Sequence, residues 1–446
     1  MTPKTRSAMW KAACLAIFLL LSGPAAIVAQ DIYFPPVPGN GTWETLDPAS
    51  LGWCPGRIDS LYNFLGSKNT KAFMVLKDGR IVLEHYFGTF TQDSLWYWAS
   101  AGKTLKSTLV GIAQEEGYLD INAPASTYLG TGWTSETPTQ EQQITVRHQL
   151  SMTTGLDDGV DDPDCTDPGC LHYKADAGMR WAYHNAPYTL LRDVVASATG
   201  QPFQVYFNQK IKNPIGMDGL WIPVGELQLY FSTARSMARF GLLALNGMVW
   251  GTDTILHDTA FFHDATSPSQ HLNQGYGYLW WLNGQSSFMM PQTQLVFPGP
   301  LMPDAPPDMF CGLGKNNQLL NVVPSQGIVL VRLGNDPDPD PNTPSVSILL
   351  DNQIWQRMNE LDCNTGITEP DGPLMQVSPN PCTGRLQVTW PTGHGTVPVL
   401  VMDTMGRTVA RRLGPGMIGT EHLAPGAYVV QVSDGAHRLV SHFVKQ

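Results

Sequence analysis

The sequence of 446 residues is poor in charge, because only 15% of its residues are Asp, Glu, Lys or Arg. Acidic residues outnumber basic ones by 38 to 27, which gives a formal net charge of −11. Nucleic acids and anionic membranes attract basic surfaces, so nucleic acid is excluded as the main partner. The 42% of hydrophobic residues, with 43 Gly and 35 Pro, exclude a disordered polyelectrolyte, a coiled coil and a collagen-like rod. We expect a soluble globular protein of two or three domains.

Apolar runs long enough to cross a membrane are also missing. The run Cys14–Leu21 is well short of the ~20 residues that a spanning helix needs. Positive residues precede it and small residues follow it up to Ala29, which is typical of a secretory signal peptide. We therefore predict a signal peptide over residues 1–30, export across the inner membrane, and a secreted or cell-surface protein.

Cysteines are few. After the predicted signal, six remain, and an even number in an exported protein permits disulfides in any of 15 pairings. Cys165 and Cys170 flank a turn rich in Asp, Pro and Gly, and they form the favoured pair. Repeated C-x-x-C spacing and nearby paired histidines are absent, so no zinc site is expected. The aspartate-rich segment 155–167 lacks the EF-hand spacing and is interpreted as a solvated loop. No metal and no organic cofactor is predicted.

The G-x-S-x-G motif of the α/β-hydrolases is absent, whereas Ser100-Ala101-Gly102-Lys103 is the only Ser-x-x-Lys of the chain. It opens a segment with helical spacing that runs to Glu116, with Gly117 as its expected C-terminal cap. Residues i and i+3 share a helix face, so the Lys103 amine can reach the Ser100 hydroxyl. A serine needs a base to become a nucleophile, and lysine serves as one when burial lowers its pKa.

Tyr183-His184-Asn185 supplies a phenol and an amide of the kind that assist such a pair. His184 is expected to point away from the pocket. A second Tyr-x-Asn, Tyr206-Phe207-Asn208, lies within a predicted helix over 201–212, and its tyrosine is expected in the core. We therefore predict that Tyr183-His184-Asn185 is the motif of the site. Five tryptophans either line an apolar pocket or simply pack in the core: Trp96, Trp98, Trp181, Trp280 and Trp281.

Strands are predicted early and late in the main domain. Residues 71–76 and 80–86 flank Lys77-Asp78-Gly79 and predict a hairpin, and residues 278–282, 319–323 and 328–333 predict later strands. Helical segments lie between them. The order predicts an α/β (α+β) fold with one sheet built from both ends of the domain.

Together with a third motif, Gly312-Leu313-Gly314 before a late strand, these residues resemble the serine β-lactamase and DD-peptidase superfamily over residues 55–360. The likeness is closest to its β-lactamase-related serine hydrolases. The resemblance implies a β-lactamase/transpeptidase-like antiparallel sheet flanked by helices, with a helical lobe, over residues 31–363.

The resemblance also implies roles for single residues. Ser100 would be the acylated nucleophile, Lys103 its base and Tyr183 the proton shuttle. Substrate would be bound by Asn185, Gly312, Leu313 and Gly314, and the backbone N–H groups of Ser100 and Lys315 would form the oxyanion hole. The substrate would be a small-molecule or peptide-like ester or amide.

Two other functions stay open. The first is a penicillin-recognising DD-peptidase or β-lactamase, although Gly312 and Leu313 lack the hydroxyl or cation that would grip a carboxylate. A carboxylate-binding residue in the pocket would favour it. The second is a catalytically silent surface binding protein on the same scaffold.

The last part of the sequence differs from the main domain, because it consists of short strand-like runs separated by turns. A turn-rich linker is predicted over 364–377, followed by short strands at 386–390, 397–402, 428–432 and 437–444. Residues 378–446 resemble the C-terminal sorting domain of the type IX secretion system, with a generic immunoglobulin-like module as the alternative. The resemblance implies a small β-sandwich that is recognised by the type IX secretion machinery.

Overall fold

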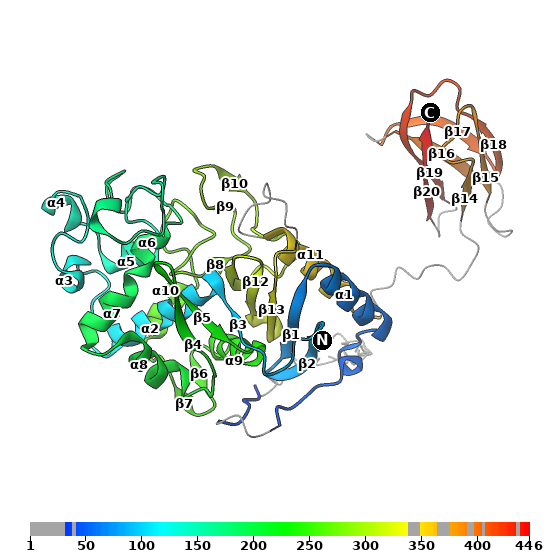
Figure 1. Cartoon of the computed structure of the whole chain (residues 1–446). Helices are drawn as coiled ribbons and strands as arrows, with labels where there is room; N and C mark the ends of the chain where they lie inside the picture. Colours follow the sequence, from blue (N-terminus) through cyan, green and yellow to red (C-terminus); the bar gives the residue numbers. More distant parts are fainter. Residues whose placement is uncertain are drawn as a thin grey trace, which may run out of the picture. The chain divides into compact units, whose positions relative to one another are not determined.

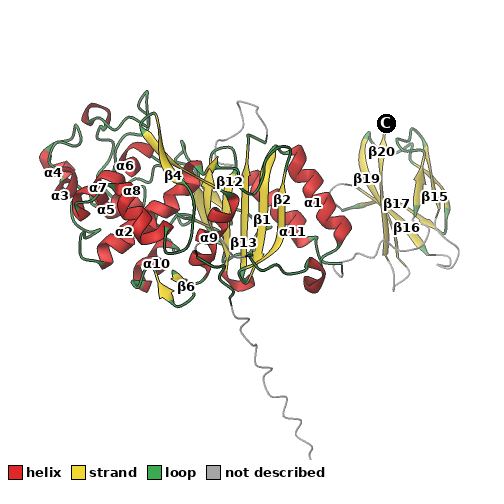
Figure 2. Ribbon diagram, turned by 60° about the horizontal axis from the view of Figure 1, so that its bottom comes forward, coloured by secondary structure: helices red, strands yellow, loops and turns green. Residues whose placement is uncertain are grey.

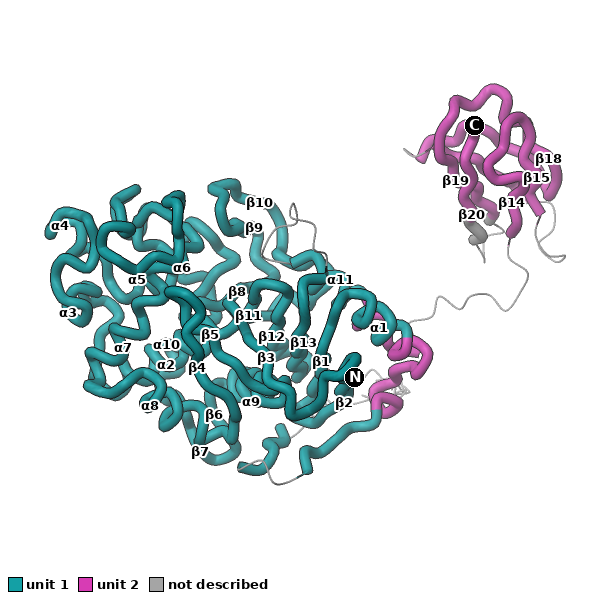
Figure 3. Tube along the Cα trace, in the orientation of Figure 1, with its two compact units in different colours: residues 1–47, 60–356 teal, residues 48–59, 357–446 magenta. Residues whose placement is uncertain are grey.

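The computed structural model describes residues 32–37, 42–337, 348–363, 375–389, 397–403, 406–433 and 438–446 (Figure 1). The predicted signal peptide and residues 364–374 of the predicted linker lie outside these ranges. The chain divides into two compact units, residues 1–47 with 60–356, and residues 48–59 with 357–446 (Figure 3). No helix in the described ranges is long and apolar enough to cross a membrane.

The main sheet is antiparallel, has six strands and draws them from both ends of the first unit, as predicted. Its order is β2-β1-β13-β12-β11-β8. The strands are β1 (Thr70–Lys77), β2 (Arg80–Tyr86), β8 (Trp281–Leu282), β11 (Phe310–Gly314), β12 (Gln318–Val323) and β13 (Ile328–Gly334). The predicted hairpin is confirmed as β1–β2, which turns at Asp78 and Gly79, both with positive φ.

Helices cover both faces of this sheet (Figure 2). Helix α9 (Ala234–Leu245) lies against β1, β12 and β13, so closely that a Cβ on Gly241 would stand 2.4 Å from Val329 and 2.8 Å from Leu320. Successive residues of a strand face opposite sides. Asn321 therefore faces away from α9, and there it donates a hydrogen bond to Asp351 of α11 (Ile348–Asn359).

The predicted helical lobe is present and surrounds α2 (Lys103–Glu115), whose first eleven residues are buried. Gly117 follows α2 in the left-handed conformation that ends a helix, as expected. The predicted helix over 201–212 is confirmed as α8 (Phe203–Phe207) continued by a π-turn, η4 (Asn208–Lys212). The other helices are α1 (Pro55–Ser67), α3 (Ser126–Leu129), α4 (Pro138–Glu141), α5 (Val146–Leu150), α6 (Asn185–Thr189), α7 (Leu191–Thr199) and α10 (Thr259–Ala265). Short 3₁₀ turns are η1 (Pro48–Leu51), η2 (Ala99–Gly102), η3 (Pro168–Cys170) and η5 (Pro324–Gln326).

A second, three-stranded sheet has the order β3-β5-β4, with β3 (Trp96–Tyr97), β4 (Leu220–Val224) and β5 (Leu227–Ser232). Two small hairpins complete the unit: β6 (Val249–Trp250) with β7 (Asp253–Thr254), and β9 (Ser287–Met289) with β10 (Val296–Pro298). β3 leads directly into η2, so this sheet positions the segment around Ser100.

One strand prediction needs correction, and one strand was missed. Of the predicted strand 278–282, only Trp281 and Leu282 are extended, because Leu279 has a φ of 62° and breaks the strand. Gly312-Leu313-Gly314 precedes a late strand, β12, as expected, but it also forms the end of another strand, β11, which sequence reasoning missed. Glycine is depleted in strands, so its two copies hid β11 from sequence reasoning.

The C-terminal strands form the predicted β-sandwich, in which a three-stranded sheet and a four-stranded sheet share one core. The core includes Leu386, Val399, Val430 and Phe443. The first sheet is β14 (Gln376–Ser378), β15 (Arg385–Thr389) and β18 (Gly416–Gly419); the second is β16 (Pro398–Met402), β17 (Thr408–Leu413), β19 (Gly426–Ser433) and β20 (Arg438–Lys445). Sequence reasoning missed β14, β17 and β18, and β14 begins inside the predicted linker.

Four cysteines are paired in the structure. Cys165 is joined to Cys170, and Cys54 to Cys363, whereas Cys311 and Cys382 are free and buried.

Arg332, in the middle of the main sheet, is fully buried and makes five hydrogen bonds. Its guanidinium donates to Thr70 Oγ1 (3.0 Å) and to the carbonyls of Lys68 (2.7 Å), Asn316 (2.9 Å), Asn317 (2.7 Å) and Asn335 (3.3 Å). Burial lowers the pKa of Arg332 to about 9. One side chain thus ties the start of β1 to the turn between β11 and β12.

We expect Arg332→Met to destabilise the protein by about 3 kcal/mol or more, because it leaves several buried oxygens without a donor. Urea unfolding of both proteins measures the difference. Arg192→Met is the control, since Arg192 pairs with Asp193 at a part-exposed position where a salt bridge contributes little. Equal losses in the two variants would contradict this account of Arg332.

Candidate active site

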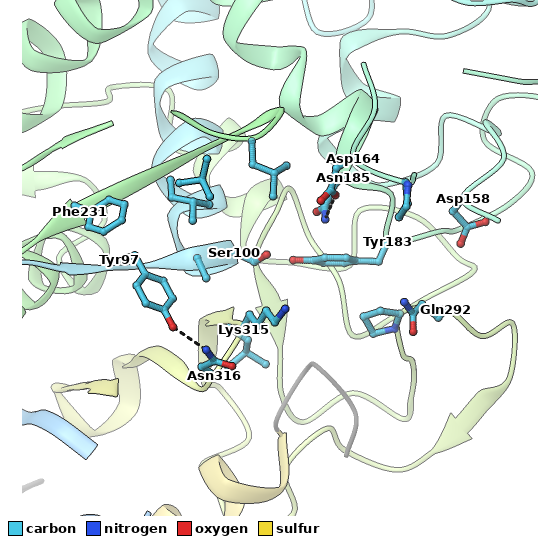
Figure 4. Close-up of a pocket in the computed structure, with 17 residues that line it drawn as sticks. Tyr97, Ser100, Asp158, Asp164, Tyr183, Asn185, Phe231, Gln292, Lys315 and Asn316 are labelled. Atoms are coloured by element: carbon cyan, nitrogen blue, oxygen red, sulfur yellow. Dashed lines mark hydrogen bonds between the residues drawn. The ribbon is translucent and has the colours of Figure 1, made fainter. Parts of the chain in front are cut away.

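Ser100 lies on the turn η2, between β3 and α2. The residue before it, Ala99, has a φ of 47°, which is unusual for a residue with a Cβ. Such a conformation costs about 1–3 kcal/mol and persists only where the surroundings enforce it. The sharp turn brings the Ser100 side chain into a cavity (Figure 4).

Lys103, the first residue of α2, donates hydrogen bonds to the Ser100 hydroxyl (3.1 Å) and to Asn185 Oδ1 (2.8 Å). Its side chain is 3% exposed. Burial disfavours the ammonium form and lowers the pKa of Lys103 to about 7, while the Asp164 carboxylate opposes part of that shift. At neutral pH a large fraction of Lys103 is therefore the neutral amine that can accept a proton.

Asn185, the first residue of α6, connects Lys103 to an acidic residue. Its amide Nδ2 donates to Asp164 Oδ1 (2.8 Å), while its Oδ1 accepts from Lys103. The amide orientation is set by these two partners, a carboxylate and an amine. Ser100, Lys103, Asn185 and Asp164 thus form one continuous hydrogen-bonded chain.

Tyr183 points its phenol at the Ser100 hydroxyl (Figure 4). Its ring stacks on Trp281 with centroids 5.7 Å apart and meets Tyr276 edge-on at 6.0 Å. Burial raises the pKa of Tyr183 well above its usual range, and a hydrogen bond with Ser100 offsets part of the effect. Tyr183 is consequently a phenol, which donates a proton, and not a phenolate at neutral pH.

Gly312 and Gly314 let β11 lie against the turn that carries Ser100. A Cβ on Gly314 would stand 2.3 Å from the carbonyl oxygen of Trp98, and one on Gly312 would stand 3.2 Å from that of Ala101. Leu313 lines the cavity between them. The structure thus gives the two glycines a packing reason that does not involve a substrate carboxylate.

The turn after β11 places Lys315 beside the cavity. Asn316 and Asn317 both have positive φ, which asparagine tolerates better than most residues, and Asn316 donates to the Tyr97 hydroxyl (2.8 Å). Lys315 is the residue between this pair and Gly314, and its side chain lines the cavity (Figure 4). Of the described residues lining the cavity, Lys315 alone carries a positive charge.

The cavity has a volume of about 610 Å3, within the range of small-molecule sites. One wall is apolar and comes from the three-stranded sheet. The other carries Asp158, Asp164 and Gln292 (Figure 4). The described lining residues are Tyr97, Ala99, Ser100, Asp158, Pro163, Asp164, Tyr183, Asn185, Val224, Leu227, Leu229, Phe231, Pro291, Gln292, Leu313, Lys315 and Asn316.

The structure therefore brings together the predicted catalytic and substrate-binding residues. Most of them line the cavity, whereas Lys103 contacts Ser100 and Asn185 from behind the lining, and Gly312 and Gly314 pack against the turn that carries Ser100. The disulfide-bonded Cys165 and Cys170 do not line the cavity. His184 is not among the lining residues, and Tyr206 is buried in the core, where it donates to Glu116. None of the five tryptophans lines the cavity. Trp98, Trp181, Trp280 and Trp281 are core residues with at most 1% exposure.

Asp158 and Asp164 were missed by sequence reasoning, which interpreted segment 155–167 as a solvated loop. Both line the cavity, and Asp158 also pairs with Arg180 at 2.7 Å. The disulfide that follows Asp164 directly in sequence was the available signal for an ordered segment. Within the described ranges, no three His, Cys, Asp or Glu side chains gather as a metal site.

Comparison with known proteins agrees with this geometry. Residues 68–351 match the model of the beta-lactamase family, so the chain belongs to that family and is a hydrolase of the β-lactamase fold. Residues 376–446 match the model of the secretion system C-terminal sorting domain.

Individual relatives are distant. A provisionally named penicillin-binding protein of Bacillus subtilis (strain 168), PbpX, is 26% identical over 159 residues, which is 32% of this chain and 39% of that protein. The chain thus spans well under half the length of this curated relative.

Solved structures share the fold. One is provisionally named a 6-aminohexanoate-dimer hydrolase, from Bacillus anthracis (19% identity, TM-score 0.54, 74% of this chain and 91% of that chain). Another is a provisionally named beta-lactamase from Bacteroides dorei (16% identity, TM-score 0.55, 69% and 99%).

A second lysine, Lys106, lies one helical turn after Lys103 and is 1% exposed. Its amine has no hydrogen-bond partner in the described part of the chain. The amine lies 4.3 Å from the centre of the Tyr188 ring, and the Lys103 amine lies 3.9 Å from the centre of the same ring. Burial, and then repulsion from Lys103, lower the pKa of Lys106 well below 10.5. The unfolded chain therefore binds the proton of Lys106 more tightly than the folded chain does, which costs stability at pH values below 10.5.

We expect Lys106→Met to raise the unfolding temperature, because it removes this cost. A lysine whose pKa falls on folding makes stability rise with pH up to its unfolded pKa, so the gain should be largest at acidic pH and shrink towards pH 10.5. Thermal unfolding from pH 6 to 10 measures it. The control is Lys210→Met, at a part-exposed position paired with Glu116. A loss of stability in Lys106→Met at every pH would contradict the prediction.

Proposed function

We propose that the protein is a secreted serine hydrolase that cleaves an ester or amide through an acyl-enzyme on Ser100. The observation that carries the proposal is the contact of Lys103 with Ser100 and Asn185, with the Tyr183 phenol facing the same hydroxyl at the edge of a cavity. This arrangement supplies a nucleophile, a base and a proton donor within one hydrogen-bonded group.

In acylation, the neutral Lys103 amine takes the proton of the Ser100 hydroxyl as Oγ attacks the substrate carbonyl carbon. The developing oxyanion is bound by the backbone N–H groups of Ser100 and Lys315, and one such donor is typically worth ~10²–10³ in rate. When the tetrahedral intermediate collapses, Tyr183 gives its proton to the leaving oxygen or nitrogen. The alcohol or amine then leaves, and the Lys103 ammonium gives its proton to Tyr183, which becomes a phenol again.

In deacylation, water attacks the ester of Ser100. Tyr183 and Lys103 accept the water proton and return one to Ser100 Oγ, so that the carboxylic acid leaves and the resting enzyme is restored. Asn185 holds the Lys103 amine in place throughout. The substrate lies along the end of β11, where Leu313 lines the cavity and Gly312 and Gly314 let the strand approach the turn of Ser100.

The C-terminal domain fits export. A sorting domain over residues 376–446 indicates secretion to the cell surface or beyond. We infer that residues 1–30 direct the chain across the inner membrane and that the β-sandwich is then recognised by the type IX secretion machinery.

The direct test is intact mass spectrometry of the full mature chain after reaction with an activated ester. We expect a mass increase equal to the acyl group, or turnover, in the wild type. The control is Ser100→Ala, in which both should vanish because the only group that the proposal acylates is absent. Failure of the wild type to be labelled or to turn over any ester or amide would leave the silent binding protein as the better account.

The proposed mechanism also predicts how kcat/KM depends on pH. The value of kcat/KM should rise with pH through about 7, since only the neutral Lys103 accepts the Ser100 proton. Asp164→Asn should move this rise to lower pH, because the Asp164 carboxylate stabilises the ammonium form. Asp158→Asn is the matched control and should leave the midpoint in place. If the midpoint of the rise in kcat/KM is the same in Asp164→Asn as in the wild type, the role given to Lys103 is contradicted.

A second candidate function is supported by Lys315, whose ammonium group could bind the carboxylate of a penicillin or of a peptide terminus. The same mass spectrometry with a penicillin distinguishes it. A penicillin adduct that disappears in Lys315→Ala, while labelling by the ester persists, would favour the penicillin-recognising reading.

A further inference from the structure

The wall of the cavity that β3, β4 and β5 form is apolar although part of it is open to solvent. Side chains alternate along a strand, so Leu227, Leu229 and Phe231 of β5 share the face that lines the cavity. Tyr230 and Ser232, on the other face, are fully buried. Leu227, Leu229 and Phe231 are half-buried, and Val224, the partner of Leu227 on β4, is 47% exposed.

This face is continuous with the nucleophile. Tyr97 of β3 pairs with Phe231 in the sheet register, with their rings 6.0 Å apart. Only Trp98 separates Tyr97 from Ala99 and Ser100, the first two residues of η2. All of these residues except the intervening Trp98 line the same cavity. A molecule bound covalently to Ser100 Oγ can therefore extend along the sheet without leaving the cavity.

The two sides of Ser100 differ in chemistry. Tyr183, the proposed proton donor to the leaving group, approaches Ser100 from the side of Asp158, Asp164 and Gln292, whereas Phe231 and Tyr97 lie on the opposite side (Figure 4). A leaving group must lie beside the donor that protonates it. The acyl part then points the other way, towards the apolar sheet.

We propose that this sheet face binds an apolar acyl chain, so that the substrates are esters or amides of aliphatic carboxylic acids longer than acetate. The inference rests on the proposed function, because it names the acyl part of a substrate of Ser100. Burial of a chain against Val224, Leu227, Leu229 and Phe231 removes apolar surface from water on both partners. The acidic side offers no such gain and suits a polar or cationic leaving group.

Two isomeric esters test this directly. Methyl hexanoate and pentyl acetate have the same composition and differ only in whether the chain is on the acyl or the alcohol side. We expect kcat/KM of the full mature chain to favour methyl hexanoate at least about tenfold, since each buried methylene is worth up to about fourfold. Equal rates, or a preference for pentyl acetate, would overturn the proposal while leaving the hydrolase function standing.

Variants locate the effect. Leu229→Ser and Val224→Ser should both reduce the ratio of the two kcat/KM values several-fold, and Val224, being exposed, can be changed without opening the core. The control is Leu220→Ser, which makes the same substitution on β4 at a residue that is 45% exposed and does not line the cavity. It should leave the ratio unchanged. A ratio that responds equally to all three would overturn the assignment to this face.

A binding measurement distinguishes the proposed acyl-chain site from the proposed hydrolase function. Calorimetry of methyl hexanoate with Ser100→Ala needs no chemistry, and we expect binding to weaken about tenfold in Ser100→Ala/Leu229→Ser. If the wild type turns over neither ester and is not labelled by the activated ester, but this loss of binding is found, the hydrolase function fails and the apolar chain site stands. If methyl hexanoate binds equally well to Ser100→Ala and to Ser100→Ala/Leu229→Ser, the proposal of an acyl-chain site is overturned.

Discussion

The guanidinium of Arg332 is the interaction on which the geometry of the site depends. It joins the carbonyls of Asn316 and Asn317, which follow β11, to Thr70 at the start of β1. The same turn is held to the Ser100 side by the hydrogen bond from Asn316 to Tyr97. Gly314, within contact of the Trp98 carbonyl, completes the junction. The two backbone segments proposed to bind the oxyanion are therefore set by a cation buried in the main sheet, and a small shift there would alter both.

The proposed role of Lys103 as a base follows from its place at a helix terminus. Its position three residues after Ser100 brings the two side chains into contact, its burial lowers its pKa, and the Asp164 carboxylate limits that fall. Tyr183 experiences the same burial with the opposite consequence, because the neutral form of a phenol is its acid. One buried environment thus favours the neutral form of both groups, which is the form that the proposed base and the proposed proton donor each need.

What could be predicted from the sequence was largely what local spacing determines. Ser-x-x-Lys, the Lys-Asp-Gly hairpin and the helix stopped by Gly117 each depend on residues a few positions apart, and the family resemblance added the order of the motifs. The acidic wall could not be predicted, because Asp164 meets Asn185 only after α6 and the disulfide loop have packed. Strand β11 was missed because the glycines that its packing against η2 requires are poor strand formers. An apolar run such as 278–282 predicts burial reliably and backbone conformation poorly.

The bond between Cys165 and Cys170 has a consequence for when the site becomes complete. It closes a loop of a few residues, so its effect on overall stability through chain entropy is small. The residue just before it is Asp164, and the carbonyl of Pro163 accepts a hydrogen bond from the first turn of α6. Closure of this bond therefore acts on the partner of Asn185 and Lys103, and it requires an oxidising compartment. In the proposed mechanism, one oxidation step therefore completes the surroundings of the base, and the reducing cytoplasm disfavours that step.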